Sequence, residues 1–156
     1  MSHENHVKLA EPAAPAGDVA AKMKARLADL KRRQEQRDEE REKKALESQL
    51  VEAELVDKYE QELGERGVYW QIFKTPEGFI VVKLGDWVHF KKFITSKSVN
   101  GVTAPEDAHS FAVANLVYPT REQFNVIADK FGALGHVIAN ELARMHAGRR
   151  RDEEGK

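Results

Sequence analysis

Residues 117–148 read VYPTREQFNVIADKFGALGHVIANELARMHAG, and this stretch decides how the C-terminal half of the chain folds. Thr120 followed by Gln123 places a hydroxyl and an amide at the spacing that caps the start of a helix. Behind this start, apolar residues recur on one helical face: Phe124, Ile127, Ala128 and Phe131. Because glycine readily ends a helix, the pattern predicts a short amphipathic helix that stops at Gly132.

A second apolar stripe lies in the same stretch and consists of Leu134, Ile138, Leu142 and Met145. It predicts another short helix, which Gly148 is expected to end. Upstream, Thr103-Ala-Pro-Glu106 combines a hydroxyl cap, an early proline and a glutamate three residues on, so it predicts a further helix start. These patterns serve to bury apolar side chains, either the chain's own or those of a partner.

A β-hairpin is predicted ahead of these helices. Residues 68–74 alternate between two faces, residues 79–84 are nearly all apolar, and Thr75-Pro76-Glu77-Gly78 between them is a strong turn sequence. Since a two-stranded ribbon is marginal alone, helices must cover its apolar face. Asp86 is placed to cap the next helix, which carries four apolar residues on one side: Trp87, Phe90, Phe93 and Ile94. Residues 96–102, after this helix, are expected to form a loop.

The N-terminal half has a different composition. Residues 1–17 are rich in Ala and Pro and predict a disordered leader. Residues 18–65 predict one long charged helix, capped by Asp18 and spanning roughly 70 Å at about 1.5 Å per residue. Residues 66–148 are then the compact domain, and residues 149–156 a charged flexible tail. The predicted fold class is α+β, mostly α: a long charged N-terminal helix, one β-hairpin and a small bundle of short helices.

The charges of the long helix are sorted along it. Residues 22–44 hold ten Lys or Arg against six Asp or Glu, a balance of +4, whereas residues 45–65 hold one Lys against seven acids, a balance of −6. An antiparallel pair would set opposite charges against each other, so a homodimer through residues 18–65 is one hypothesis. The other is a solvated helix whose charges confer solubility. Residues 31–44 are wholly polar, which argues against a continuous coiled coil.

Composition and motifs argue against several classes of function. The chain has 156 residues, a formal net charge of −1 and no cysteine, so it has no disulfide, no thiolate chemistry and no strong field to attract nucleic acid. No apolar run reaches the roughly 18 residues of a membrane span. Its six histidines lack metal-ligand spacing, and neither a strained serine turn nor a phosphate loop is present. We therefore expect no enzyme, cofactor, metal site or membrane insertion.

The case for nucleic acid rests on two basic segments and is weak. Arg149-Arg150-Arg151 is followed at once by Asp152-Glu153-Glu154, which offsets its charge. Residues 22–44 are net positive, but they interleave six acids and contain no aromatic residue on which a base could stack. A nucleic-acid-associated regulator therefore stays a third hypothesis, behind two classes of protein-binding function.

Five short motifs occur in a fixed order in the C-terminal half: Tyr118-Pro119, Phe124, Gly132-Ala133-Leu134, Asn140-Glu141-Leu142 and Ala147-Gly148. In this order they resemble the C-terminal region of small tailed-phage proteins, the tail assembly chaperones and their relatives. The layout upstream is also similar, with a hairpin such as 69–84, an aromatic-bearing helix such as 87–94 and a helix such as 104–116. The resemblance covers about residues 66–148.

The resemblance implies a non-enzymatic chaperone, made in the cytoplasm of a bacterial host, which binds apolar helical segments of the tape measure protein before tail tube subunits polymerise. Aromatic residues are the natural anchors for such a partner, with core packing as the alternative for each. The candidates are Trp70, Trp87, Phe90, Phe93, Phe124 and Phe131. The alternative function is a structural virion or scaffold component that uses the long helix for assembly contacts.

Overall fold

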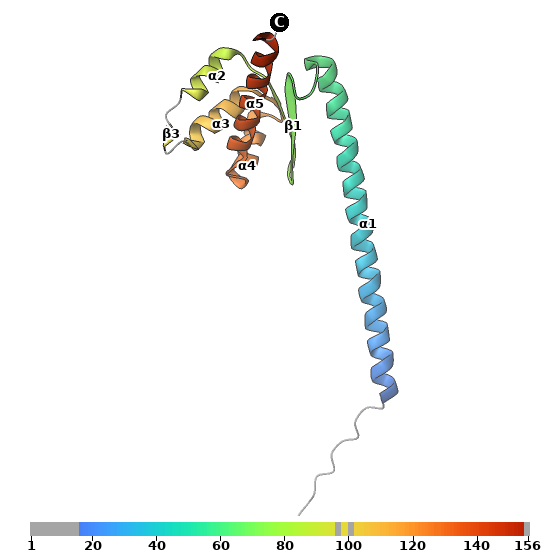
Figure 1. The fold of residues 1–156 in the computed structure, drawn as a ribbon. Helices are drawn as coiled ribbons and strands as arrows, with labels where there is room; N and C mark the ends of the chain where they lie inside the picture. The colour runs from blue at the N-terminus through green and yellow to red at the C-terminus, as the bar shows by residue number, and fades with distance from the viewer. Residues whose placement is uncertain (1–15, 96–97, 100–101, 155–156) are drawn as a thin grey trace, which may run out of the picture. The chain divides into compact units, whose positions relative to one another are not determined.

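The structure is a computed structural model that describes residues 16–95, 98–99 and 102–154. The predicted leader, except for its last two residues, lies outside these ranges. The chain divides into two compact units, residues 1–49 and residues 50–156. The second unit contains a small sheet and four helices besides the end of the long N-terminal helix (Figure 1). The predicted α+β class with mostly helical content is confirmed.

Helix α1 (Ala16–Leu63) is the long helix that the sequence predicts. It begins two residues before the expected cap, so Asp18 lies in its first turn and forms an ion pair with Lys22 over 2.8 Å. Gly64 ends it with a φ of +92°, a left-handed conformation that glycine adopts without strain. In the first unit the described side chains from residue 17 to residue 47 are all exposed.

The hairpin is confirmed, with β1 (Trp70–Thr75) paired antiparallel to β2 (Gly78–Lys83). Its register sets Thr75 opposite Gly78, and Gly78 has a φ of +136°. A third strand, β5 (Leu116–Tyr118), pairs with the other side of β2, so the strand order is β1-β2-β5. The sequence did not predict this third strand, because three residues are too few to show the alternation that marks a strand.

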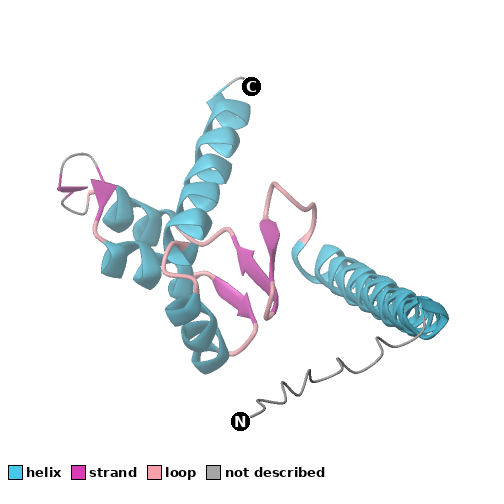
Figure 2. Ribbon diagram, turned by 90° about the horizontal axis from the view of Figure 1, so that it is seen from below, coloured by secondary structure: helices cyan, strands magenta, loops and turns pink. Residues whose placement is uncertain are grey.

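Both faces of this sheet are covered (Figure 2). One face, with Trp70, Ile72, Phe79 and Val81, packs against Tyr59 at the end of α1. The other face contributes Ile80 and Val82 to the larger core beneath the C-terminal helices. Burial on both sides explains why β2 is apolar along its length. Because Tyr59 is only 3% exposed, the compact unit includes the end of α1 and begins at Leu50, not at residue 66 as predicted.

Four helices follow the hairpin: α2 (Trp87–Ile94), α3 (Pro105–Ala114), α4 (Arg121–Lys130) and α5 (Leu134–Glu154). The capping box of Thr120 and Gln123 is present at the start of α4, and the Asp86 carboxylate caps α2. The predicted cap at Thr103 is wrong. Ala104 is the N-cap of α3 and makes no side-chain cap bond, and Pro105, which has no N–H to satisfy, occupies the first turn.

Two further expectations are corrected by the backbone. The predicted loop between α2 and α3 contains a short pairing of β3 (Ser98–Val99) with β4 (Val102–Thr103). Helix α5 passes through Gly148 and continues to Glu154, so residues 149–154 are helical instead of a flexible tail. Gly148 is not among the described glycines with positive φ. It therefore does not form the left-handed cap that ends a helix, and the Arg and Glu residues beyond it favour helix.

Candidate partner-binding surface

Helix α2 is held at its start by Asp86. The Asp86 carboxylate accepts hydrogen bonds from the backbone N–H of His89 over 3.1 Å and lies 2.9 Å from Nδ1 of the same residue. The backbone hydrogen bond, followed by the side-chain one, lowers the pKa of Asp86 below its ordinary value. The N-cap therefore stays charged and fixes the direction in which the eight-residue helix leaves the sheet.

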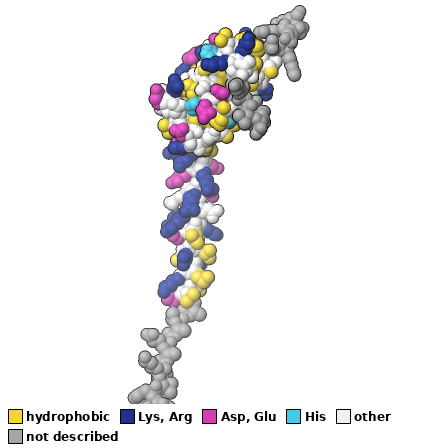
Figure 3. Space-filling model, turned by 90° about the vertical axis from the view of Figure 1, so that its left-hand side faces the viewer, with side chains coloured by type: hydrophobic (Ala, Val, Ile, Leu, Met, Phe, Trp, Pro, Cys, Tyr) yellow, Lys and Arg dark blue, Asp and Glu magenta, His cyan; other side chains and the backbone are white. Residues whose placement is uncertain are grey.

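The outer side of α2 exposes large apolar side chains. Trp87 is 43% exposed, Val88 71% and Ile94 51%. Trp87 and Ile94 are seven residues apart, so they lie two turns along the same side of the helix, and Val88 is next to Trp87. We call Trp87, Val88 and Ile94 the α2 surface. Figure 3 views the molecule from the side of α2 and shows apolar side chains among charged ones there.

A cavity of about 700 Å³ adjoins α2 where it meets α3. The ring of Phe93 stacks on that of Phe111 at its wall, with centroids 4.5 Å apart and planes 9° from parallel. Lys92 and Asp107 also line this cavity, which places one charge of each sign beside the stacked rings. The other lining residues are His89, Thr95, Ser110 and Ala114.

An aromatic cluster holds α2 against α5. Phe90 stacks on the imidazole of His146 with centroids 4.3 Å apart, and Trp87 meets the same imidazole edge-on at 6.4 Å. His146 is only 8% exposed, and burial, assisted by the charge of Arg149, lowers its pKa below the ordinary value, whereas Asp86 opposes this shift. Trp87 therefore contacts a buried imidazole, while part of its own surface lies in solvent.

The predicted anchors divide between the core and the surface. Trp70 and Phe124 are fully buried, which favours core packing over contact with a partner for both. Phe90 is also buried, whereas Phe93 and Phe131 are half-buried beside the core. Among the six candidates, Trp87 is the one with a large exposed surface. The exposed Val88 was missed, although apolar residues all around so short a helix were the available signal.

Trp70 has a structural role that explains its burial. Its indole Nε1 donates a hydrogen bond over 2.7 Å to the carbonyl oxygen of Gly64, which ends α1. Its ring lies 6.0 Å from that of Tyr59 on the last turns of α1. The residue therefore joins the end of α1 to β1, and its polar atom is satisfied inside the core.

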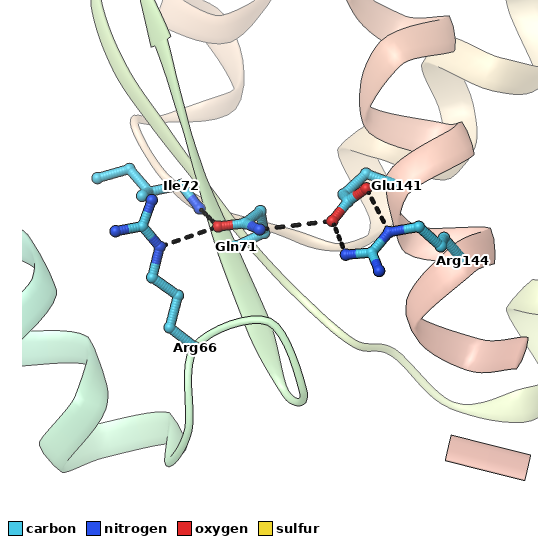
Figure 4. A network of polar contacts seen from close by, with 5 residues as sticks. All are labelled: Arg66, Gln71, Ile72, Glu141 and Arg144. Atoms are coloured by element: carbon cyan, nitrogen blue, oxygen red, sulfur yellow. Dashed lines mark hydrogen bonds and ion pairs between the residues drawn. The ribbon is translucent and has the colours of Figure 1, made fainter. Parts of the chain in front are cut away.

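A polar network crosses from β1 to α5 (Figure 4). The side-chain oxygen of Gln71 accepts from Arg66 Nε and from the backbone N–H of Ile72, each over 3.0 Å. The Gln71 amide donates to Glu141, which also forms an ion pair with Arg144. Every member has a partner within the fold, so the network serves to position elements, and we assign no chemistry to it.

Two of the described histidines, His109 and His136, lie beside one cavity. His109 Nε2 lies 3.1 Å from the side-chain oxygen of Asn125, and its ring stacks on Phe124. His109 and His136 both line a second cavity of about 440 Å³, together with Glu106 and Asp129. Even so, no three His, Asp or Glu side chains among the described residues are arranged to hold a metal ion.

Within the described ranges, no helix is both long enough and apolar enough to cross a membrane. Comparison of the chain with protein-family models, with curated proteins and with solved structures gives no match in any of the three.

Proposed function

We propose that this protein is a non-enzymatic assembly chaperone of a tailed phage, acting in the cytoplasm of the bacterial host. Its partner is an apolar helical segment of the tape measure protein, bound before the tail tube polymerises. The observation that carries the proposal is the α2 surface, where three large apolar side chains are exposed on eight residues. Exposed apolar side chains grouped in this way mark sites of protein interaction. The motif order of residues 118–148 supports the tailed-phage assignment.

The chemistry of α2 suits an amphipathic helix as ligand. Trp87 and Ile94, two turns apart, offer apolar contacts at the spacing that a partner helix presents, and Trp87 is the residue type that most often anchors an interface. Lys91 and Lys92 lie in the last turn of α2. They favour a ligand whose apolar side chains are flanked by acidic ones.

The test is a pull-down from phage-infected cells with the tagged chain, read by mass spectrometry. We compare the wild type with Val88→Glu and Ile94→Glu, which place charges on the α2 surface without removing a buried group. Val126→Glu is the matched control, because Val126 is 58% exposed on α4. Enrichment of one long helical tail protein by the wild type and the control, with loss in both α2 variants, supports the proposal. Equal recovery of that tail protein by the wild type and all three variants contradicts the proposal.

A structural virion or scaffold component is the second candidate, and one observation favours it. Val19, Met23, Leu27 and Leu30 of α1 are each at least 50% exposed and recur on one helical side. They would provide assembly contacts along a shell or tube. Purified virions discriminate the two functions: a structural component is present at fixed copy number, whereas a chaperone is absent.

A further inference from the structure

We propose that the contact of His146 with Phe90 and Trp87 makes the attachment of α2 to α5 sensitive to pH. Near neutral pH the unprotonated imidazole lies inside the aromatic cluster and holds α2 in place. As the pH falls, protonation of His146 loosens α2 from α5 before the rest of the fold is affected. The proposal does not depend on what the α2 surface binds.

The buried position of the His146 imidazole explains why its protonation is unfavourable. His146 is more than nine-tenths buried, and its Nε2 is buried with no hydrogen-bond partner among the described residues. A neutral imidazole tolerates this position when Nε2 is the nitrogen without a proton, because an apolar surrounding leaves only a lone pair unsatisfied. An imidazolium carries N–H groups on both nitrogens, so protonation adds a buried donor and a charge.

The charged groups near the imidazole, together with burial, determine whether the pKa of His146 rises or falls. Arg149, on the same helix three residues on, opposes a second positive charge. Asp86, at the N-cap of α2, favours one, but its carboxylate already accepts two hydrogen bonds from His89. Stacking on Phe90 offers the imidazolium some cation–π attraction, which does not replace hydration of the buried N–H. Burial and Arg149 together therefore outweigh Asp86, in agreement with the lowered pKa.

The direction in which stability changes with pH follows from the linkage between protonation and folding. The ordinary pKa of histidine is about 6.5, and the folded state holds that of His146 lower. The contribution of His146 to stability is therefore complete above pH 6.5. It is lost as the pH falls from 6.5 through the folded pKa. Because the stacked rings are the contact between His146 and α2, the loss acts on α2 first.

Amide hydrogen exchange tests this inference. The rate for α2 is divided by the rate for α4 at each pH, which removes the intrinsic dependence of exchange on pH. In the wild type this ratio should rise several-fold between pH 7.5 and pH 5. His146→Phe keeps a stacking ring that cannot titrate, so its ratio should stay flat.

Two controls keep the test decisive. His89→Gln removes the other histidine near the start of α2 and should retain the rise in the ratio. Should His146→Phe fail to fold, the imidazole of wild-type His146 is titrated by NMR. A pKa below 6.5 agrees with the proposal. A pKa at or above 6.5, or an exchange ratio that rises equally in wild type and His146→Phe, overturns it.

Discussion

The side-chain amide of Gln71, on β1, donates a hydrogen bond over 3.4 Å to the carboxylate of Glu141, on α5. The two residues are 70 positions apart in the chain, and their contact joins the hairpin to the last helix. Gln71 also accepts from Arg66 and from the backbone of Ile72 at the edge of the sheet. One glutamine thus satisfies part of an edge strand while it orients α5.

Replacing Gln71 should therefore cost more than replacing an exposed glutamine elsewhere. Gln71→Leu keeps the size of the side chain but leaves the N–H of Ile72 and the guanidinium of Arg66 without this acceptor. We expect a loss of about 1 kcal/mol in the free energy of unfolding, measured by urea denaturation. Gln61→Leu, on the exposed side of α1, is the control. A loss in Gln61→Leu as large as that in Gln71→Leu would contradict the structural role of the network.

The ion pair of Glu141 and Arg144 predicts a specific dependence on acid. The hydrogen bonds from Arg144, and then that from Gln71, lower the pKa of Glu141, while burial opposes the shift. The charged carboxylate is thus favoured by folding, so its stabilisation is present above about pH 4.5 and is lost as the pH falls through the folded pKa. Arg144→Gln should be slightly less stable than the wild type at pH 6, and the loss should be small because Arg144 is exposed and solvent screens the ion pair. The difference in stability between wild type and variant should shrink as the pH falls below about 4.5, and a difference that stays constant with pH would refute this assignment.

The sequence was sufficient where local chemistry decides the structure. The Thr120 capping box, the Asp86 cap and the turn ending at Gly78 are each specified by residues within four positions of one another. The apolar stripes on α4 and α5 correctly identified buried residues such as Phe124, Ile138 and Leu142. Long-range relationships were not accessible in this way. Strand β5 has only three residues, and its pairing with β2 depends on the packed helices around it.

The candidate surface was predicted less well, for a physical reason. An aromatic residue that anchors a partner and one that fills a core have the same residue type and periodicity. Trp70 and Trp87 illustrate this, since the first is fully buried and the second is 43% exposed. Only the packing of the end of α1 on one face of the sheet, through Tyr59, decides that Trp70 belongs to the core.

The two tryptophans should accordingly behave differently when truncated. Trp70→Ala removes a fully buried ring and its hydrogen bond to Gly64, so we expect a loss of about 3–5 kcal/mol. Trp87→Ala should cost less, because part of its ring is in solvent. Thermal unfolding of both variants provides the comparison. A larger loss for Trp87 than for Trp70 would place the structural tryptophan on α2 and contradict the burial seen here.

The capping box gives a prediction confined to α4. Thr120→Ala removes the hydroxyl that accepts from the backbone N–H of Gln123, which should cost about 1 kcal/mol. Thr120→Ser retains a hydroxyl and should recover most of the loss. Both are measured by chemical denaturation. Equal stability of the alanine and serine variants would mean that the hydroxyl does not contribute to α4.

Substitution by alanine is expected to have opposite effects on stability at two glycines, Gly85 and Gly148. A Cβ atom at Gly85 would overlap the side-chain oxygen of Asn115, which is 1% exposed and donates from Nδ2 to the carbonyl of Phe111 over 2.8 Å. Asn115 cannot move aside without losing that bond, and its backbone carbonyl also accepts from Lys83. Gly85→Ala should therefore destabilise the fold by about 1–3 kcal/mol.

At Gly148 an added Cβ meets no atom within 4 Å, and the residue lies inside α5. Gly148→Ala should consequently stabilise the protein, by up to about 0.5–1 kcal/mol, because alanine loses less backbone entropy in a helix. Urea denaturation of both variants beside the wild type checks the two signs together. If Gly148 ended α5 in a left-handed conformation, as the sequence alone suggested, alanine there would destabilise instead. Whether Gly148→Ala raises or lowers the free energy of unfolding therefore decides whether the helix continues beyond Gly148.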